Sequence, residues 1–182
     1  TNPYKLGSPP DFGTLYSGRA LEFDGVTDYV DCGDINAIDG ASALTMSCWV
    51  KLDSTSGAEP ILSKYTDSSN RVHLFMNSNV MYLTTSTSGD KQGYFAYTST
   101  DWNYIVMVFD GSGSANADRL KGYMNGEEQT LSFTGTIPAT LPDLGASTFM
   151  IGGQGGAYYD GEISNVQLWD KAWSLSDVQY AY

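Results

Sequence analysis

Aspartates near the start of the chain are the residues best suited to hold a metal ion. Asp24 and Asp28 bracket a turn at Gly25, and six carboxylates lie between Glu22 and Asp39 with no Lys or Arg among them. A tight turn can direct carboxylate and carbonyl oxygens to one point, and calcium prefers six to eight such ligands. The run of acids therefore indicates either that a cation neutralises some of them or that they form solvated loops.

Catalytic constellations are missing from the sequence. His73 is the single histidine, and no Gly-x-Ser-x-Gly motif occurs, so a nucleophilic triad has neither base nor elbow. One histidine and two cysteines on apolar strands do not supply a tetrahedral zinc site. We predict that His73 lies on a sheet face or at the surface, and that the protein has no catalytic residues.

Three aromatic residues are candidates for ligand contact. Tyr158 and Tyr159 follow a glycine-rich loop at 152–156, where small residues let a ligand approach the backbone. Trp49 shares its strand face with Thr45 and Ser47, which suits stacking against a sugar with polar groups nearby. The alternative for Trp49, and to a lesser degree for the tyrosines, is packing.

The elements that must position these residues are strands. Alternation is clearest at 44–51, where Leu44, Met46, Cys48 and Val50 share one face. Asn125-Gly126 predicts a hairpin, and Ser176 with Gln179 predicts a capped helix that closes the chain. About a dozen strands at this spacing indicate a β-sandwich or barrel. The predicted strands are 20–24, 28–32, 44–51, 60–65, 71–77, 80–85, 94–97, 102–110, 120–124, 129–133, 149–152 and 162–169.

Length and composition limit the classes of protein to which this chain can belong. The 182 residues suit one domain, with a Pro- and Gly-containing arm or linker at 1–18 and the domain at 19–182. Net charge is −12, which excludes nucleic acid as a partner. We see no signal peptide and no apolar run that would insert into a membrane. Cys32 and Cys48 are expected to be a buried free pair, with a disulfide as the alternative.

Five segments in order resemble laminin G-like domains of the pentraxin type. They are 20–30 (ALEFDGVTDYV), 44–50 (LTMSCWV), 61–64 (ILSK), 102–111 with 123–127 (WNYIVMVFDG, YMNGE), and 151–153 with 160–169 (IGG, DGEISNVQLW). The resemblance covers about residues 18–182 and implies an all-β, antiparallel jelly-roll sandwich of the concanavalin A-like lectin/glucanase superfamily. It departs from the family at Thr27, where relatives often carry Asp.

The resemblance also bears on chemistry. In related domains the first and last strands lie side by side, so Asp160 is expected to face Asp24 and Asp28. We therefore predict a calcium site formed by Asp24, Gly25, Asp28 and Asp160. The alternative is that these Asp-Gly pairs only start turns. Glycanases of this fold need a Glu-x-Asp-x(-x)-Glu face, and Val26 and Thr27 stand where the third acid belongs.

Together these features predict a non-catalytic, calcium-stabilised recognition module. Its ligand would be a glycan or a protein, met on an extracellular, cell or virion surface. The alternative is a structural decoration or adhesion unit in a larger assembly, with neighbouring subunits or a parent multidomain protein as partners. A glycoside hydrolase or lyase is the least favoured class.

Overall fold

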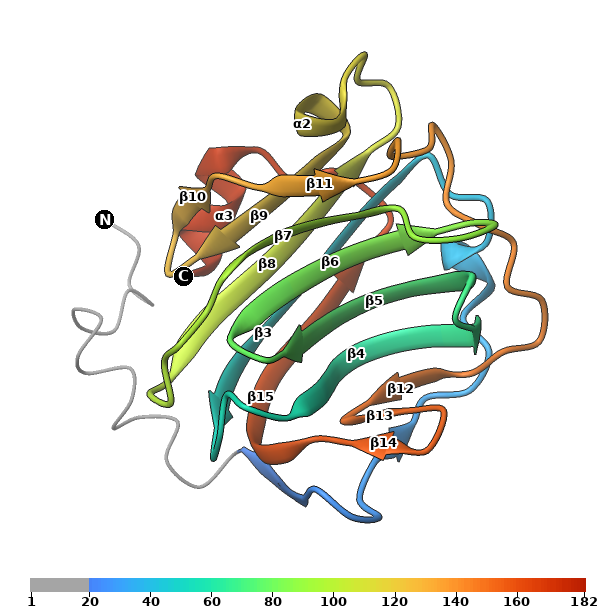
Figure 1. Ribbon diagram of the computed structural model, residues 1–182. Coiled ribbons are helices and arrows are strands. Elements are labelled where there is room, and N and C mark those ends of the chain that lie inside the picture. The colour runs from blue at the N-terminus through green and yellow to red at the C-terminus, as the bar shows by residue number, and fades with distance from the viewer. Residues whose placement is uncertain (1–19) are drawn as a thin grey trace.

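Two antiparallel sheets stack in a computed structural model that describes residues 20–182. Figure 1 shows β4 to β7 crossing in front of β3, β8 and β15. One sheet has six strands, in the order β1 (Leu21–Asp24), β15 (Asp160–Trp169), β3 (Ala43–Leu52), β8 (Asn103–Asp110), β9 (Leu120–Met124) and β10 (Glu127–Gln129). The predicted arm at 1–18 lies outside the described residues.

The second sheet has seven strands. Their order is β11 (Ser132–Thr134), β7 (Gln92–Ala96), β6 (Val80–Ser86), β5 (Asn70–Asn77), β4 (Ala58–Asp67), β12 (Phe149–Ile151) and β2 (Val30–Asp31). A two-stranded hairpin, β13 (Gly153–Gln154) and β14 (Ala157–Tyr158), lies beside β4. A 3-10 helix, η1 (Asn36–Ile38), and a short helix, α2 (Asn116–Arg119), occupy connections. The predicted antiparallel jelly-roll sandwich is confirmed.

The core lies between the sheets and follows the period-two alternation of the strands. On β3 the predicted inner face, Leu44, Met46, Cys48 and Val50, is buried. On the facing sheet Val72, Leu74 and Met76 of β5 are buried in the same core, as are Met81 and Leu83 of β6. The same alternation sends the other side chains of β5 and β6 to the outer face of the seven-stranded sheet, and that face positions the site described below.

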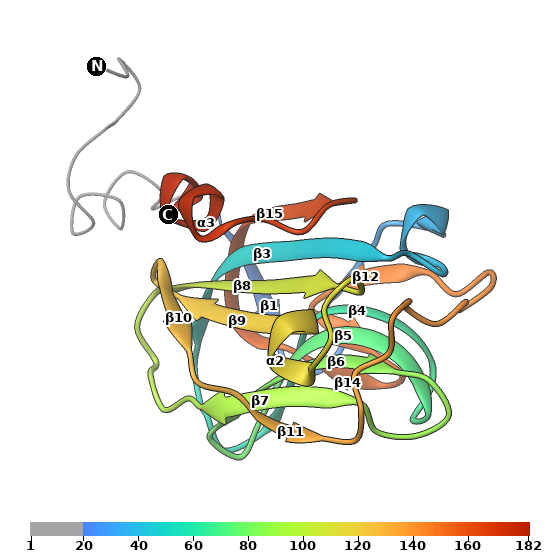
Figure 2. The ribbon, with the colours of Figure 1, turned by 90° about the horizontal axis from the view of Figure 1, so that it is seen from above.

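Strand β8 is buried on both faces, as its apolar sequence predicts. Its outward side chains, with Tyr123, meet Trp173 and Val178 from the C-terminal segment, which includes helix α3 (Leu175–Ala181). In Figure 2 α3 lies next to β15 and β3, away from β6 and β7. The helix therefore covers the outer face of the six-stranded sheet and leaves that of the seven-stranded sheet open.

The predicted helix cap is wrong by two residues. Ser174, not Ser176, is the N-cap: its hydroxyl accepts from the Asp177 N–H (3.3 Å), and its own N–H donates to the Asp177 carboxylate (2.9 Å). An anionic carboxylate near the positive end of the helix dipole is a better partner than the neutral Gln179 amide.

Cysteine burial also differs from the prediction. Cys48 is buried and free as expected, whereas Cys32 is free but exposed. The reason is that β2 is only two residues long and lies at the sheet edge, so Cys32 falls just beyond the strand.

The hairpin at Asn125-Gly126 is confirmed, with both residues at positive φ (54° and 81°). The predicted strand 129–133 is not one strand, because the chain crosses from β10 in one sheet to β11 in the other within it.

Candidate functional site

The first and last strands bring the predicted metal-binding residues together. In the β1–β15 pair, Asp24 lies opposite Asp160. These two residues and Asp28 line one cleft of about 490 Å³. We call this region the acidic edge, and its charged lining residues are Glu22, Asp24, Asp28, Lys51, Asp53, Asp160 and Glu162. Lys51 is the only basic residue in that lining, and it pairs with Glu162 at 2.7 Å.

Asp24 uses its carboxylate to hold the turn that follows it. Oδ1 accepts the backbone N–H groups of Val26 (2.9 Å), Thr27 (2.8 Å) and Asp28 (3.1 Å). These bonds, led by that of Thr27, lower the pKa of Asp24 to about 2. Oδ2 accepts the Thr27 hydroxyl (3.3 Å), so both oxygens of Asp24 bond within the turn, as the turn-forming alternative expects.

Gly25 is required by the close approach of the two strands. It has φ +69°, and an added Cβ would lie 2.9 Å from the Cβ of Asp160. Its N–H donates to the Tyr159 carbonyl (3.0 Å). The Asp160 N–H in turn donates to Glu59 (2.9 Å), whose pKa burial raises. The backbone at this edge is thus held from both sheets.

The acidic edge fits calcium in its chemistry and only in part in its geometry. All of its acidic side chains offer oxygen, the donor that calcium prefers. Within residues 20–182, however, no group of three or more His, Cys, Asp or Glu side chains is gathered closely enough to hold a metal ion. A cation here would need the side chains to turn inward or the turn's carbonyls to contribute.

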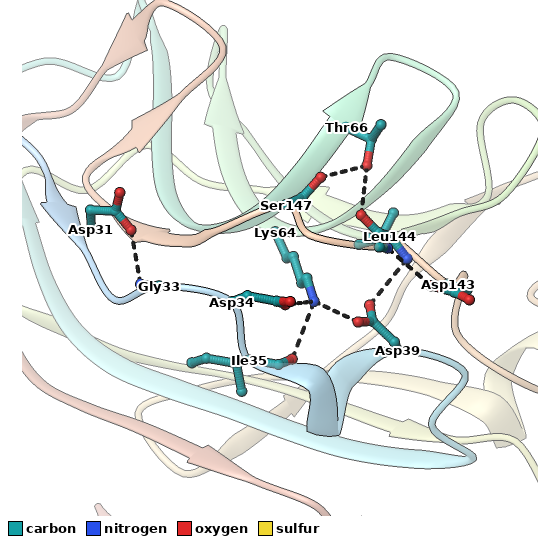
Figure 3. A network of polar contacts seen from close by, with 11 residues as sticks. Asp31, Gly33, Asp34, Ile35, Asp39, Lys64, Thr66, Asp143, Leu144 and Ser147 are labelled. Atoms are coloured by element: carbon teal, nitrogen blue, oxygen red, sulfur yellow. Dashed lines mark hydrogen bonds and ion pairs between the residues drawn. The ribbon is translucent and has the colours of Figure 1, made fainter.

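A second group of acids from the same stretch is neutralised by the protein itself. Lys64 of β4 is fully buried, and its ammonium donates to Asp34 (2.8 Å), Asp39 (2.7 Å) and the Ile35 carbonyl (3.3 Å), as Figure 3 shows. We call Lys64, Asp34 and Asp39 the Lys64 cluster. Although burial by itself lowers the pKa of Lys64, the bonds to both carboxylates raise it above its usual value.

The Lys64 cluster joins three segments of the chain. The Asp39 carboxylate also accepts the N–H of Leu144 (3.1 Å), so the loop before β3 is tied both to β4 and to the loop before β12. For two of the acids at 22–39, the neutralising cation is therefore a lysine of β4.

A pocket lies on the outer face of the seven-stranded sheet. Its volume is about 300 Å³, and we call it the outer-face pocket; its lining is Tyr65, Ser68, Arg71, His73, Phe75, Asn77, Tyr82, Gln92 and Gln154. Alternation on β5 places Arg71, His73, Phe75 and Asn77 here, opposite the core-facing side chains. Strands β4, β6 and β7, the turn between β4 and β5, and the β13–β14 hairpin supply the rest.

A continuous row of rings crosses this face. His73 stacks on Phe75 (centroids 5.1 Å apart, planes 13°), Phe75 meets Tyr82 (6.3 Å), and Tyr82 meets Tyr94 (5.6 Å). We call these four residues the aromatic row. His73 is buried, whereas Phe75, Tyr82 and Tyr94 are half-buried. These three rings offer flat apolar surface beside polar groups, which is the composition of a small-ligand site.

His73 is one of the residues that line the outer-face pocket. It lies on the sheet face, as predicted, and Nδ1 hydrogen-bonds Oε1 of Gln154 from the β13–β14 hairpin. Burial lowers the pKa of His73 to about 3, so the ring is neutral at pH 7.

Arg71 has a polar atom that is buried and unpaired. Nη2 donates to Asp90 (2.7 Å). Nη1 is inaccessible to water and has no hydrogen-bond partner among residues 20–182. Because Nη1 is also inaccessible to solvent, a ligand acceptor reaches its unsatisfied hydrogens only when the Arg71 side chain shifts toward the pocket.

The predicted ligand-binding aromatics lie elsewhere. Tyr159 is fully buried, edge-on to Phe23 (5.9 Å), with its hydroxyl donating to the Lys51 carbonyl (3.0 Å), so it has no surface to offer a ligand. Trp49 stacks with Tyr182 (5.6 Å) beneath α3, as the packing alternative expects. Tyr158 is half-buried beside Tyr29 (6.2 Å).

Sequence reasoning missed the outer-face pocket. Its one visible sign is the alternation at 71–77, which leaves a polar and aromatic face opposite the core face. That this face meets Tyr82, Gln92 and Gln154 depends on pairing with other strands.

Comparisons with known proteins agree with this architecture. The Laminin_G_3 family model, described as the concanavalin A-like lectin/glucanases superfamily, matches residues 24–179. A search of the curated proteins finds no match.

Several solved structures have the same fold. A native heptameric SAP-like pentraxin from Limulus polyphemus has a TM-score of 0.59 at 18% identity, over 88% of this chain and 79% of its own. Domain 4 of the extracellular arabinanase AbnA from Geobacillus stearothermophilus, in complex with arabinotriose, has a TM-score of 0.62 at 13% identity, over 87% of this chain and 85% of its own. The CBM40 of the Ruminococcus gnavus IT-sialidase, bound to α2,3 sialyllactose, has a TM-score of 0.62 at 14% identity, over 89% of this chain and 97% of its own.

Proposed function

We propose a function from one premise: the chain belongs to the concanavalin A-like lectin/glucanases superfamily. Its domain is a non-catalytic recognition module that binds a glycan in the outer-face pocket. The observation that carries this proposal is the aromatic row, set in a pocket of about 300 Å³ among guanidinium and amide groups. Aromatic faces stack against the apolar faces of sugar rings, and the polar groups fix orientation.

The similar structures support a glycan over other ligands. Two of them were solved with arabinotriose and with sialyllactose. The pocket is also small, at about 300 Å³, and its lining is mixed in polarity. A pocket of this kind suits a sugar better than a protein partner, because protein interfaces need a larger area.

A binding role is supported over a catalytic one by what the pocket offers. Glycoside hydrolysis uses a pair of carboxyl groups that flank the bond, and the lining residues include no Asp or Glu. His73 is neutral and bonded to Gln154, so it is a poor general acid at pH 7.

The test is glycan-array screening followed by titration calorimetry. Tyr82→Ala is expected to weaken binding of any array hit at least tenfold, because it interrupts the aromatic row. Tyr180→Ala is the matched control: this tyrosine is 80% exposed on α3, which covers the other sheet, and its loss should leave affinity unchanged. No hit on the array, together with self-association of the pure chain, would replace glycan binding with the alternative role as a structural unit of an assembly.

We also propose that calcium binds at the acidic edge and stabilises the pairing of β1 with β15. The support is the charge of the cleft, where six acidic residues surround one lysine. Calcium bound there would neutralise Asp24, Asp28 and Asp160, and the pocket on the other sheet would bind sugar without contact to the ion. A chelator titration, described in the Discussion, tests this role.

The place of action follows from the ligand. Glycans are displayed on extracellular, cell and virion surfaces, and we propose that the module works there. Among residues 20–182 we find no helix with the length and apolar character needed to cross a lipid bilayer.

A further inference from the structure

We propose that the outer-face pocket selects a sugar that carries a carboxylate, with Arg71 as the group that binds it. This inference rests on glycan binding in the same pocket and names the class of glycan. It is carried by the way the polar side chains of the pocket are oriented.

The amide groups of the pocket use their oxygens in hydrogen bonds to neighbouring side chains. Oε1 of Gln92 accepts from the hydroxyl of Thr84 (3.4 Å), and Oδ1 of Asn77 accepts from the hydroxyl of Ser78 (2.9 Å). Oε1 of Gln154 accepts from Nδ1 of His73, which carries the proton of the neutral ring.

The amide nitrogens are left for a ligand. Among residues 20–182 the NH₂ groups of Gln92, Asn77 and Gln154 have no hydrogen-bond partner. A primary amide usually presents both a donor and an acceptor. Here each amide oxygen already accepts one internal bond while the NH₂ groups make none, so the pocket presents more unused donors than acceptors and favours a ligand group made only of acceptors.

Arg71 adds the charge. One of its two terminal nitrogens is bonded to Asp90, and the other is buried and unpaired within the described chain. A planar guanidinium matches a planar carboxylate with two parallel hydrogen bonds. A neutral hydroxyl would satisfy one donor at a time and would leave the charge uncompensated.

The strands place the charge beside the rings. Arg71 and His73 are two residues apart on the same face of β5, about 7 Å along the strand. His73 is almost fully buried, so a sugar ring would stack on the half-buried Phe75 or Tyr82 and present its substituents across His73 toward Arg71, which lines the same pocket. The ring and the carboxylate of one sugar acid can be held together.

Asp90 opposes this binding. Its carboxylate is 53% exposed and shares the Arg71 guanidinium, so it competes with a ligand carboxylate and repels it. The net charge of −12 adds a long-range repulsion, which penalises a dianionic phosphate more than a singly charged carboxylate. Removing Asp90 should therefore improve binding of an acidic sugar.

The experiment compares each acidic sugar with its own methyl ester by titration calorimetry. The probes are sialyllactose and trigalacturonate. We expect at least one acid to bind about tenfold or more tightly than its ester, which corresponds to about 1.4 kcal/mol. Arg71→Met should abolish the difference, and Asp90→Asn should strengthen binding of the acid several-fold while leaving the ester unchanged.

The outcomes separate this inference from glycan binding itself. Asp90→Asn keeps Arg71 in place, so a gain for the acid cannot come from misfolding, and Arg71→Lys should retain part of the preference. If sugars bind in a Tyr82-dependent way but acid and ester bind equally, the carboxylate inference is overturned and glycan binding stands. A preference for the acid that neither Arg71→Met nor Asp90→Asn alters also overturns it. If no sugar binds, both proposals are overturned.

Discussion

The Lys64 cluster and the acidic edge draw their acids from the same short stretch of chain and treat them in opposite ways. At the Lys64 cluster, Asp34 and Asp39 converge on a buried ammonium. At the acidic edge, Asp24 and Asp28 line a solvent-facing cleft whose one lysine is occupied by Glu162. A run of carboxylates therefore does not by itself indicate a metal site, because the neutralising group can come from a strand far along the chain.

Burial makes the two regions unequal in energy. Breaking a buried ion pair leaves uncompensated charge in a low dielectric, whereas an exposed pair is screened by solvent. Substitutions in each region, and calcium at the acidic edge, test this difference.

The largest effect is expected from Lys64→Met. It leaves Asp34 and Asp39 without their cation, so the free energy of unfolding should fall by about 3–5 kcal/mol. Urea denaturation followed by fluorescence measures this. Lys51→Met is the matched control at the acidic edge, and its effect should be small and should fade with added salt. Equal losses in the two variants would contradict the distinction between the regions.

Calcium is expected to act on the acidic edge alone. If it binds there, calcium at about one hundred times its Kd should stabilise the domain by about 2.7 kcal/mol. For a domain of this size that is a rise in Tm of roughly 5–10 °C, which EDTA reverses. Asp160→Asn should remove the shift, and Asp34→Asn at the Lys64 cluster should retain it. If neither calcium nor EDTA changes Tm, calcium does not bind at the acidic edge.

Acid should reveal the bonds that Asp24 makes to its own turn. Its folded-state pKa of about 2 lies below the unfolded value near 3.9. The stability it contributes is therefore complete above about pH 4 and lost as the pH falls through about 2. In Asp24→Asn, which keeps an oxygen acceptor but does not titrate, Tm should fall less steeply between pH 4 and 2. Parallel Tm curves for the two proteins would show that the turn does not depend on the charge.

Much of the fold was predictable because β alternation is local. The inner face of β3, the apolar run of β8 and the Asn125-Gly126 hairpin each follow from residues close in sequence. Errors arose at element ends. Cys32 lies just past a two-residue edge strand. The helix cap is Ser174 and not the predicted Ser176, because Ser174 has the charged Asp177 as its partner.

The candidate sites were less predictable. That Asp24 and Asp160 lie opposite each other was expected from a family resemblance and is confirmed by the β1–β15 register. That Tyr159 is buried was not expected, because alternation alone does not say which face of a strand near a loop meets the core.

Local patterns in the sequence predict most of the strands, their inner faces and an excess of negative charge. Which charges are neutralised, and where a pocket forms, depend on the tertiary structure. Lys64 meets Asp34 across 30 residues, and His73 meets Gln154 across 81. The physical reason is that backbone periodicity acts between neighbours in sequence, while ion pairing and pocket formation depend on strand register and sheet stacking, which bring distant residues within hydrogen-bond reach.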